Sequence, residues 1–110
     1  MDEYKVIVTS HALHSMAKIR DYIASELSNP TAAVYHLRLF QRKIKKLSSM
    51  PGRYKPIDEQ PWHDEGVRRM KVKNYFIYYW ISEDDHIVYV TDVIYTGNDQ
   101  LKQLRKMLMK

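Results

Sequence analysis

The sequence contains no cysteine and only three glycines in 110 residues. Disulfide bonds and thiolate chemistry are therefore excluded, and a reducing compartment suits the chain. The GxGxxG and P-loop patterns that cradle phosphate groups are also missing. No run of 18 apolar residues occurs, and the opening Met1-Asp2-Glu3-Tyr4 lacks the charged-then-apolar layout of a signal peptide. We therefore expect a cytoplasmic protein that does not associate with a membrane.

The five histidines do not follow a pattern of metal ligands. His11 and His14 are three residues apart and could share a helix face, but no third ligand lies near them in the sequence. The others, His36, His63 and His86, are scattered, whereas zinc sites need clustered ligands. No local signature of a nucleophilic triad is readable either. We expect neither a metal ion nor a cofactor.

Length and charge narrow the class of protein further. A chain of 110 residues with 45% hydrophobic residues has the size and composition of one folded domain. Its 18 Lys and Arg outnumber 13 Asp and Glu, which gives a net charge of +5. We predict a single domain over residues 1–110, and the charge favours nucleic acid or an acidic protein partner equally. Solubility alone would also account for such a charge.

The first half of the sequence predicts one strand and two helices. Residues 4–8 are β-branched and aromatic, as in a strand, and Thr9 or Ser10 can cap the helix that follows. Asn29 and Pro30 suit the N-cap and first turn of a second helix, which Met50-Pro51-Gly52 ends. Apolar residues recur at helical spacing in both segments, at Ala12, Met16, Ile19, Ile23 and Leu27 and then at Ala33, Leu37, Phe40, Ile44 and Leu47.

The second half predicts a three-stranded meander and a terminal helix. Strands are expected over residues 67–72, 75–81 and 86–95, with a tight turn at Lys73-Asn74, where Asn tolerates left-handed backbone angles. Residues 100–109 complete the chain as a basic helix. The predicted class is α+β in the order β-α-α-β-β-β-α, with an N-terminal helical hairpin packed on a small, mainly antiparallel, twisted four-stranded sheet.

Basic and aromatic residues are concentrated on the meander. Arg68, Arg69, Lys71 and Lys73 precede several tyrosines, a combination that can neutralise phosphates and stack on unpaired bases. Arg or Lys could also stabilise a phosphorane. The alternative is structural, because alternate tyrosines of a central strand must face the helices. The second predicted helix has its own basic outer face, which is either a solvated surface or a binding surface: Arg38, Arg42, Lys43, Lys45 and Lys46.

Taken in order, these segments resemble the RelE/ParE superfamily of toxins from type II toxin–antitoxin systems, of the plasmid-stabilisation type. The resemblance runs from Tyr4 to about Asp99. It is carried by Tyr4-Lys5-Val6-Ile7-Val8-Thr9, Ile19-Arg20-Asp21-Tyr22-Ile23-Ala24, Ile44-Lys45-Lys46-Leu47, Pro61-Trp62, Gly66-Val67-Arg68-Arg69-Met70, Val72-Lys73-Asn74-Tyr75-Phe76-Ile77-Tyr78-Tyr79 and Val88-Tyr89-Val90. It implies a RelE-like fold and a toxin held in a hetero-oligomer by a cognate antitoxin.

The resemblance implies three possible modes of action. Members similar to RelE cut mRNA on the ribosome, and this endoribonuclease (mRNA interferase) activity is the first expectation. Members similar to ParE inhibit DNA gyrase without being nucleases. A catalytically degenerate member would survive as an antitoxin-binding co-repressor. Whether the chain is an enzyme at all is left open by the sequence.

The resemblance also assigns candidate residues and reveals departures. We expect Arg69, Lys71 and Arg68 to be catalytic phosphate binders. The candidates for RNA or partner binding are Lys73, His63, Tyr95, Arg42 and Lys45. RelE-like nucleases carry an Arg at the position of Phe76 and an Arg-rich turn where this chain has Thr96-Gly97-Asn98-Asp99, so the nuclease pattern is incomplete.

One acidic residue of the last predicted strand needs a partner. Asp92 alternates onto the same face as Val88, Val90 and Ile94, where an unpaired carboxylate would be costly. We expect Arg68 or Arg69 to be that partner.

Overall fold

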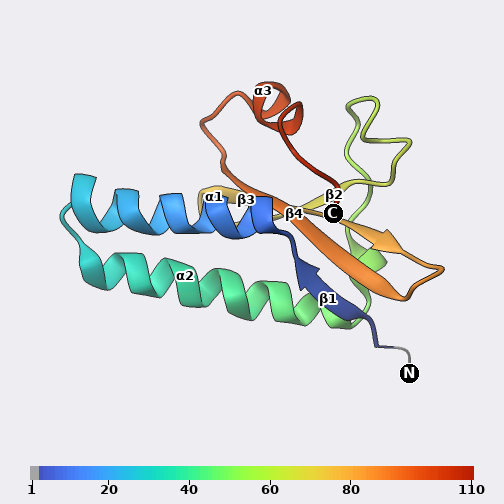
Figure 1. Ribbon diagram of the computed structural model, residues 1–110, viewed down its shortest axis with the longest axis horizontal. Coiled ribbons are helices and arrows are strands. Elements are labelled where there is room, and N and C mark those ends of the chain that lie inside the picture. Colours follow the sequence, from blue (N-terminus) through green and yellow to red (C-terminus); the bar gives the residue numbers. More distant parts are fainter. Residues whose placement is uncertain (1–2) are drawn as a thin grey trace.

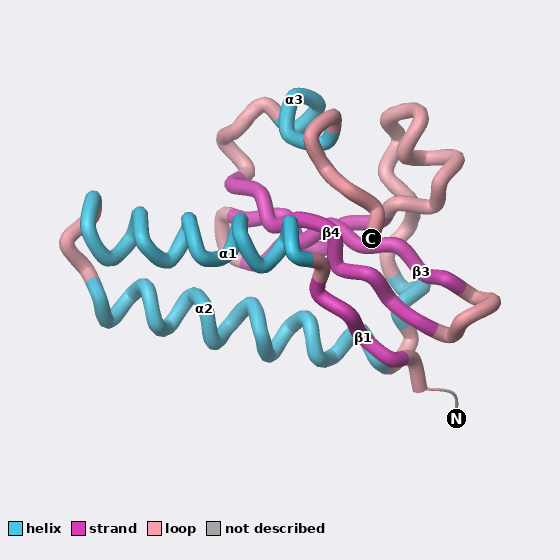
Figure 2. Tube along the Cα trace, in the orientation of Figure 1, coloured by secondary structure: helices cyan, strands magenta, loops and turns pink. Residues whose placement is uncertain are grey.

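The computed structural model describes residues 3–110 as two antiparallel helices on one face of a four-stranded sheet, with the C-terminal segment on the other face (Figures 1 and 2). The predicted α+β class and the order of its main elements are confirmed. The elements are β1 (Lys5–Val8), α1 (Ser10–Asp21), a π-helical turn (Tyr22–Glu26), α2 (Pro30–Lys45), two short 3-10 turns (Lys46–Ser48 and Pro51–Arg53), β2 (Arg68–Val72), β3 (Tyr75–Ser82), β4 (Ile87–Tyr95) and α3 (Gln100–Leu104).

The sheet is mixed in the predicted way. Its strand order is β1-β4-β3-β2, in which β1 runs parallel to β4 and the other two pairings are antiparallel. Because the meander β2-β3-β4 is joined by short turns, its strands are neighbours in space as well as in sequence. The parallel β1–β4 pair needs a long connection, which contains the helical hairpin, the loop before β2 and the strands β2 and β3.

Capping side chains determine where the two helices of the hairpin, α1 and α2, begin. The Thr9 hydroxyl accepts a hydrogen bond from the Ala12 amide at 3.2 Å, and the Asn29 side chain accepts one from the Ala32 amide at 3.1 Å. Pro30 occupies the first turn of α2, where its missing N–H breaks no helical hydrogen bond. These caps confirm the boundaries predicted for the starts of both helices.

The end of the first helix differs from the prediction. Residues Tyr22–Glu26 form a π-helical turn, and Leu27 is 57% exposed rather than part of the buried stripe. A π-turn takes more residues than an α-turn, so side chains beyond it rotate away from the apolar stripe of α1. Ile23 is still buried, and the tip of the hairpin therefore presents Leu27 to solvent.

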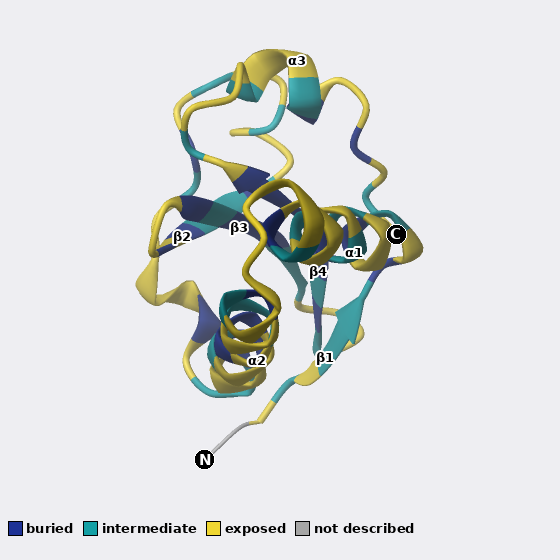
Figure 3. Cartoon of the chain, turned by 90° about the vertical axis from the view of Figure 1, so that its left-hand side faces the viewer, coloured by how far each residue is buried: buried dark blue, intermediate teal, exposed yellow. Residues whose placement is uncertain are grey.

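The strong apolar run of β3 packs on both faces of the sheet. Tyr75, Ile77 and Tyr79 belong to the core beneath the hairpin, which also contains Met70 and Val90. A second core lies on the opposite face, where Tyr78 packs with residues of the central loop, the meander and the C-terminal segment: Ile57, Val67, Ile94, Leu104 and Met107. In Figure 3 the buried parts of the chain lie along the sheet between these two layers.

The C-terminal helix is shorter than expected. It ends at Leu104 instead of continuing to Met109, and the remaining chain returns across the sheet. The indole N–H of Trp80 donates to the Met109 carbonyl at 2.7 Å, and this bond holds the end of the tail against the sheet. A second local difference lies in the β2–β3 turn, where Lys73 rather than Asn74 has the positive φ, 55°.

A β-bulge in β4 overturns the expectation for Asp92. Tyr78 pairs with Asp92 and Tyr79 with Val90, so Thr91 is an extra residue in the strand. The bulge interrupts the alternation on which the predicted face depended, and Ile94 lies in the second core while Val90 lies in the first.

The partners of the Asp92 carboxylate lie on α1 rather than on β2. The carboxylate accepts a hydrogen bond from the Ser15 hydroxyl at 2.6 Å, and its other oxygen lies 3.1 Å from His11 Nε2. It also accepts from the Val93 amide at 2.8 Å. The prediction that Arg68 or Arg69 would pair with Asp92 was therefore wrong. Asp92 instead ties the hairpin to the centre of the sheet.

Candidate functional site

Arg69 lies on the sheet face that the C-terminal segment partly covers. Its guanidinium carbon is 4.0 Å from the centre of the Phe76 ring, and its Nη1 donates to the Tyr78 hydroxyl at 3.3 Å. That hydroxyl in turn donates to the Gln100 side chain at 2.7 Å. Lys71 lies opposite Phe76 in the β2–β3 register and is exposed. We call Arg69, Lys71, Phe76, Tyr78 and Gln100 the Arg69 face.

Arg68 lies on the opposite face of β2. Its Nη1 donates to the carbonyls of Gly52, at 3.3 Å, and Tyr54. The neighbouring Tyr79 hydroxyl donates to the Pro51 carbonyl at 2.6 Å, so the two side chains together hold residues 51–54 against the sheet. The three predicted phosphate binders are therefore divided by the strand: Arg69 and Lys71 share a face, and Arg68 does not join them.

The electrostatics of the Arg69 face favour neutral tyrosine. Burial raises the pKa of Tyr78 above its usual value, and Arg69 offsets only part of this rise through its hydrogen bond and its charge. Tyr78 therefore keeps its proton at neutral pH and is not a general base. Beside Arg69 a shallow cavity of about 230 Å³ is lined mainly by residues 54–59, among which Asp58 and Glu59 contribute negative charge.

The other predicted binding residues are dispersed over the molecule. The His63 ring, in the loop before β2, has its Nδ1 2.7 Å from the Ile57 carbonyl oxygen. Tyr95 packs edge-on against Tyr75 at the far end of β4 and is 47% exposed. Arg42 and Lys45 are exposed on α2, and Lys73 is exposed in the β2–β3 turn. The structure does not bring these five residues together as one site.

Two surface hollows were not anticipated from the sequence. One, of about 700 Å³, lies between the tip of the hairpin and the ends of β3 and β4, where Tyr22, Leu27 and Tyr95 are exposed. The other follows the outer side of α2 past Val34 and Tyr35. Apart from Leu27, which belonged to the predicted stripe of the first helix, these apolar side chains lie outside the stripes that predicted the core. Exposed apolar positions on an amphipathic helix were the signal available in the sequence.

Two classes of feature are not found in the described part of the chain. Within residues 3–110, no three His, Asp or Glu side chains are grouped as a metal ion would require. None of the helices in that range has the length and apolar character of a membrane span.

Comparison with known families identifies the class of protein. The family profile described as "ParE toxin of type II toxin-antitoxin system, parDE" matches residues 6–100, which is most of the chain. The chain therefore belongs to the ParE toxin family, and it is a type II toxin of the RelE/ParE superfamily. A search of curated protein sequences gives no significant match.

Solved structures share this fold at low sequence identity. The chromosomal ParDE system from P. aeruginosa matches with a TM-score of 0.71 and 13% identity, over 86% of this chain and 98% of that one. A mutant of the E. coli toxin RelE in the free state matches with a TM-score of 0.63 and 13% identity, over 96% and 99%. The RelBE2 toxin–antitoxin complex from Mycobacterium tuberculosis matches with 0.57 and 19%, over 84% and 98%.

Proposed function

We propose that this toxin inhibits growth by binding its target, without cleaving RNA, and that the target is DNA gyrase. The observation that carries the proposal is the state of Arg69, whose guanidinium stacks on Phe76 and donates to Tyr78. The family resemblance places a phosphate-binding Arg at the position of Phe76 in the nucleases. Here that position supports the neighbouring arginine instead of binding phosphate.

The arrangement of cations argues against phosphoryl transfer at this face. A phosphorane needs several cations or hydrogen-bond donors already directed at one point. Arg68 is on the other side of the strand and donates to two backbone carbonyls, so it is not available to join Arg69 and Lys71. Of the three predicted phosphate binders two remain on this face, and one of them, Arg69, is already engaged with aromatic side chains.

Neither tyrosine nor histidine supplies a proton-transfer group at this face. A general base needs a pKa near the working pH and hydrogen-bond access to the reacting proton. Burial keeps Tyr78 protonated. Within residues 3–110, the hydrogen bonds of the histidine rings go to Asp92, to the Ala32 carbonyl and to the Ile57 carbonyl, and none goes to the Arg69 face. Inhibition by binding requires neither a cluster of phosphate-binding cations nor a general base.

Gyrase is proposed because it is the target associated with the non-nuclease members that this family resembles. The toxin would act in the cytoplasm, where gyrase and the cognate antitoxin are found. Ribosome-dependent mRNA cleavage is the second candidate, and one observation favours it: Lys71 is exposed and lies opposite Phe76, whose half-buried ring could stack on a base.

Two assays with the same purified toxin test the proposal. Relaxed plasmid is incubated with gyrase and ATP over a toxin titration, and a reconstituted translation reaction is followed by primer extension on its mRNA. We expect supercoiling to be inhibited and the mRNA to stay intact. Ribosome-dependent cuts in the mRNA with unaffected supercoiling would establish the second candidate instead. Adding antitoxin should restore whichever activity the toxin blocks, which is the control for specific inhibition.

A further inference from the structure

Three irregular segments of the chain border one hollow at the end of the sheet. The first is the tip of the hairpin, where the π-helical turn Tyr22–Glu26 is followed by Ser28 with a positive φ of 48°. The second is the β2–β3 turn, in which Lys73 has a φ of 55°. The third is the turn Thr96-Gly97-Asn98 that follows β4. Departures from regular backbone cost stability and concentrate at functional sites, so the space between these segments is a candidate site.

This space, of about 700 Å³, has an apolar wall and many polar groups; we call it the hairpin-tip hollow. The hairpin extends past the ends of β3 and β4, and its Ile19, Ile23 and Leu27 form the apolar wall (Figure 1). The polar groups come from three tyrosines, three asparagines, His36 and Lys18. Among the described residues that line the hollow there is no Asp or Glu, and Lys18 is the only Lys or Arg. The lining therefore suits a neutral or anionic ligand.

The Tyr75 hydroxyl lines this hollow and has no partner. Tyr75 is 9% exposed, and its hydroxyl makes no hydrogen bond within residues 3–110. No fully buried side-chain oxygen or nitrogen in that range lacks a partner, so this hydroxyl must reach the surface, in the hollow that Tyr75 lines. Burial raises the pKa of Tyr75, and the Tyr95 and Tyr22 phenols raise it further, so the hydroxyl keeps its proton and can donate. A mostly buried donor without a partner needs an explanation, and a ligand supplies one.

Tyr95 offers a flat aromatic surface at the edge of the hollow. Its ring packs edge-on against Tyr75 with 5.8 Å between the ring centres, and 47% of Tyr95 is exposed. Gly97 is required beside this ring, because a Cβ at that position would lie 2.4 Å from a ring carbon. Tyr75 and the Gly97 backbone therefore hold the ring in place while part of it stays open. A ring held in this way is a stacking surface for a planar ligand.

We propose that the hairpin-tip hollow binds a nucleotide whose base is unpaired. The base would stack on Tyr95. The side-chain amides of Asn74 and Asn98 each offer donors and an acceptor, which match the edge of a base. The Lys18 amine would neutralise the phosphate. Within residues 3–110 these amides and this amine make no hydrogen bond, so they are available to a ligand.

Other classes of ligand fit this lining less well. A purely apolar ligand would leave the Tyr75 hydroxyl and the asparagine amides without partners, which is costly in a covered site. An acidic polypeptide would meet a single lysine. Duplex nucleic acid keeps its bases stacked inside the helix and cannot place one against the Tyr95 ring.

This site goes beyond the proposed function and lies apart from the Arg69 face. Tyr75 belongs to the core beneath the hairpin, whereas Tyr78 belongs to the core on the opposite face of the sheet. The inference therefore holds whether the toxin inhibits gyrase or cuts RNA. Its test measures binding by the purified protein and does not depend on toxicity.

The test is calorimetric titration of the full-length toxin with adenosine 5′-monophosphate, with uridine 5′-monophosphate and with adenosine alone. We expect at least one of the two nucleotides to bind with a dissociation constant below about 1 mM. Tyr95→Leu should weaken nucleotide binding at least about tenfold, because the base loses its stacking surface. Tyr75→Phe keeps the ring and should weaken binding about fivefold through loss of the hydroxyl. Lys18→Met should weaken nucleotide binding about tenfold and leave adenosine binding unchanged, because it removes the phosphate contact alone.

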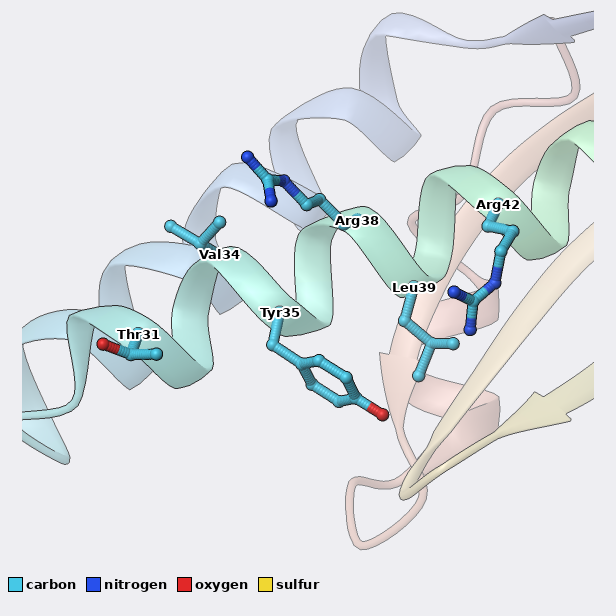
Figure 4. A pocket seen from close by; sticks show the side chains of 6 residues that line it. All are labelled: Thr31, Val34, Tyr35, Arg38, Leu39 and Arg42. Carbon is cyan, nitrogen blue, oxygen red and sulfur yellow. The ribbon is translucent and has the colours of Figure 1, made fainter.

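Matched controls remove the same side chains from α2 outside the hollow. Tyr35 is 50% exposed and lines a separate groove, where Figure 4 shows it on the side of α2 with Leu39 and Arg42. Tyr35→Leu is therefore the control for Tyr95→Leu, and Lys45→Met is the control for Lys18→Met. Each control should change nucleotide affinity by less than about twofold.

A free nucleotide and an unpaired residue of a nucleic acid strand present the same chemistry to this hollow. A single-stranded oligoadenylate is therefore titrated beside the mononucleotide. Affinity at least about tenfold higher for the oligonucleotide, lost in Tyr95→Leu, would assign the site to a strand. Equal affinities would assign it to the free nucleotide.

Two results would overturn the proposal. One is the absence of binding by both mononucleotides at about 1 mM and by the oligonucleotide. The other is binding that Tyr95→Leu and Lys18→Met change no more than their controls do. If a variant fails to fold by circular dichroism, Asn98→Ala at an exposed position replaces it and should weaken nucleotide binding about fivefold. Unchanged affinity in Asn98→Ala would then count against the site in the same way.

Discussion

Replacing Asp92 by Ala should destabilise the fold more than any surface substitution. Asp92 is 3% exposed and accepts hydrogen bonds from the Ser15 hydroxyl and the Val93 amide, with His11 Nε2 at 3.1 Å. A hydrogen bond to a charged group contributes about 1.5–3 kcal/mol, but Ser15 and His11 are part-exposed and can turn to water. We therefore expect a loss of about 3 kcal/mol in the free energy of unfolding.

The loss translates into a measurable change in melting temperature. With an unfolding entropy of about 2.1 cal/mol/K per residue, a chain of this size loses roughly 13 °C for about 3 kcal/mol. Thermal denaturation followed by circular dichroism, together with urea unfolding, measures both quantities. Asp92→Asn keeps one acceptor oxygen and should lose about half as much. Asp84→Ala, in an exposed turn, is the control and should change stability by less than about 0.5 kcal/mol. An Asp92→Ala protein as stable as the control would refute this account of the carboxylate.

Three further predictions concern the sheet. Burial raises the pKa of Tyr79 to about 12, so the stability that the protonated hydroxyl contributes is complete below about pH 10 and is lost as the pH rises toward 12. Tyr79→Phe should flatten this decline in the free energy of unfolding, as measured by urea unfolding. At pH 7 the same substitution should cost about 1 kcal/mol, because the Pro51 carbonyl loses its donor. Arg69→Met should raise the pKa of Tyr78 further, as read by NMR of labelled tyrosine. Arg68→Met should accelerate amide hydrogen exchange in residues 52–54.

Most of the fold could be predicted because its signals are local. The caps at Thr9 and Asn29, with Pro30 behind the second, define the start of each helix. The apolar run of β3 predicts a central strand buried on both faces, and the structure has one core on each side of it. Because short turns join the strands of the meander, each strand pairs with its neighbour in the sequence.

Features that depend on a single inserted residue or a tertiary contact were not predictable. The extra Thr91 in β4 shifts the faces of the strand beyond it, and a pattern of alternation cannot reveal where such a shift occurs. The π-turn has the same effect on Leu27 in the first helix. The tail leaves the helix after Leu104 because Trp80 and the second core hold it against the sheet, which the sequence around residue 105 does not encode.

The candidate site was predicted in part. Strand alternation already places Arg68 on the face of Met70 and Val72, away from Arg69 and Lys71, and the structure has that arrangement. The contacts of Arg68 and Arg69 could not be predicted from the sequence, because they depend on backbone carbonyls and aromatic rings from other elements. The outer side of α2 was half anticipated: its basic face was recognised from the sequence, and the exposed Val34 and Tyr35 beside it were not.

The central claim, inhibition by binding rather than RNA cleavage, is tested most directly in cells within minutes of toxin induction. Plasmid topology on chloroquine gels and the 5′ ends of abundant mRNAs are followed in the same samples, with an antitoxin-expressing strain as control. We predict that plasmids lose negative supercoiling before protein synthesis declines, while the mRNA ends stay unchanged. New mRNA 5′ ends appearing while plasmid topology is still normal would contradict the account.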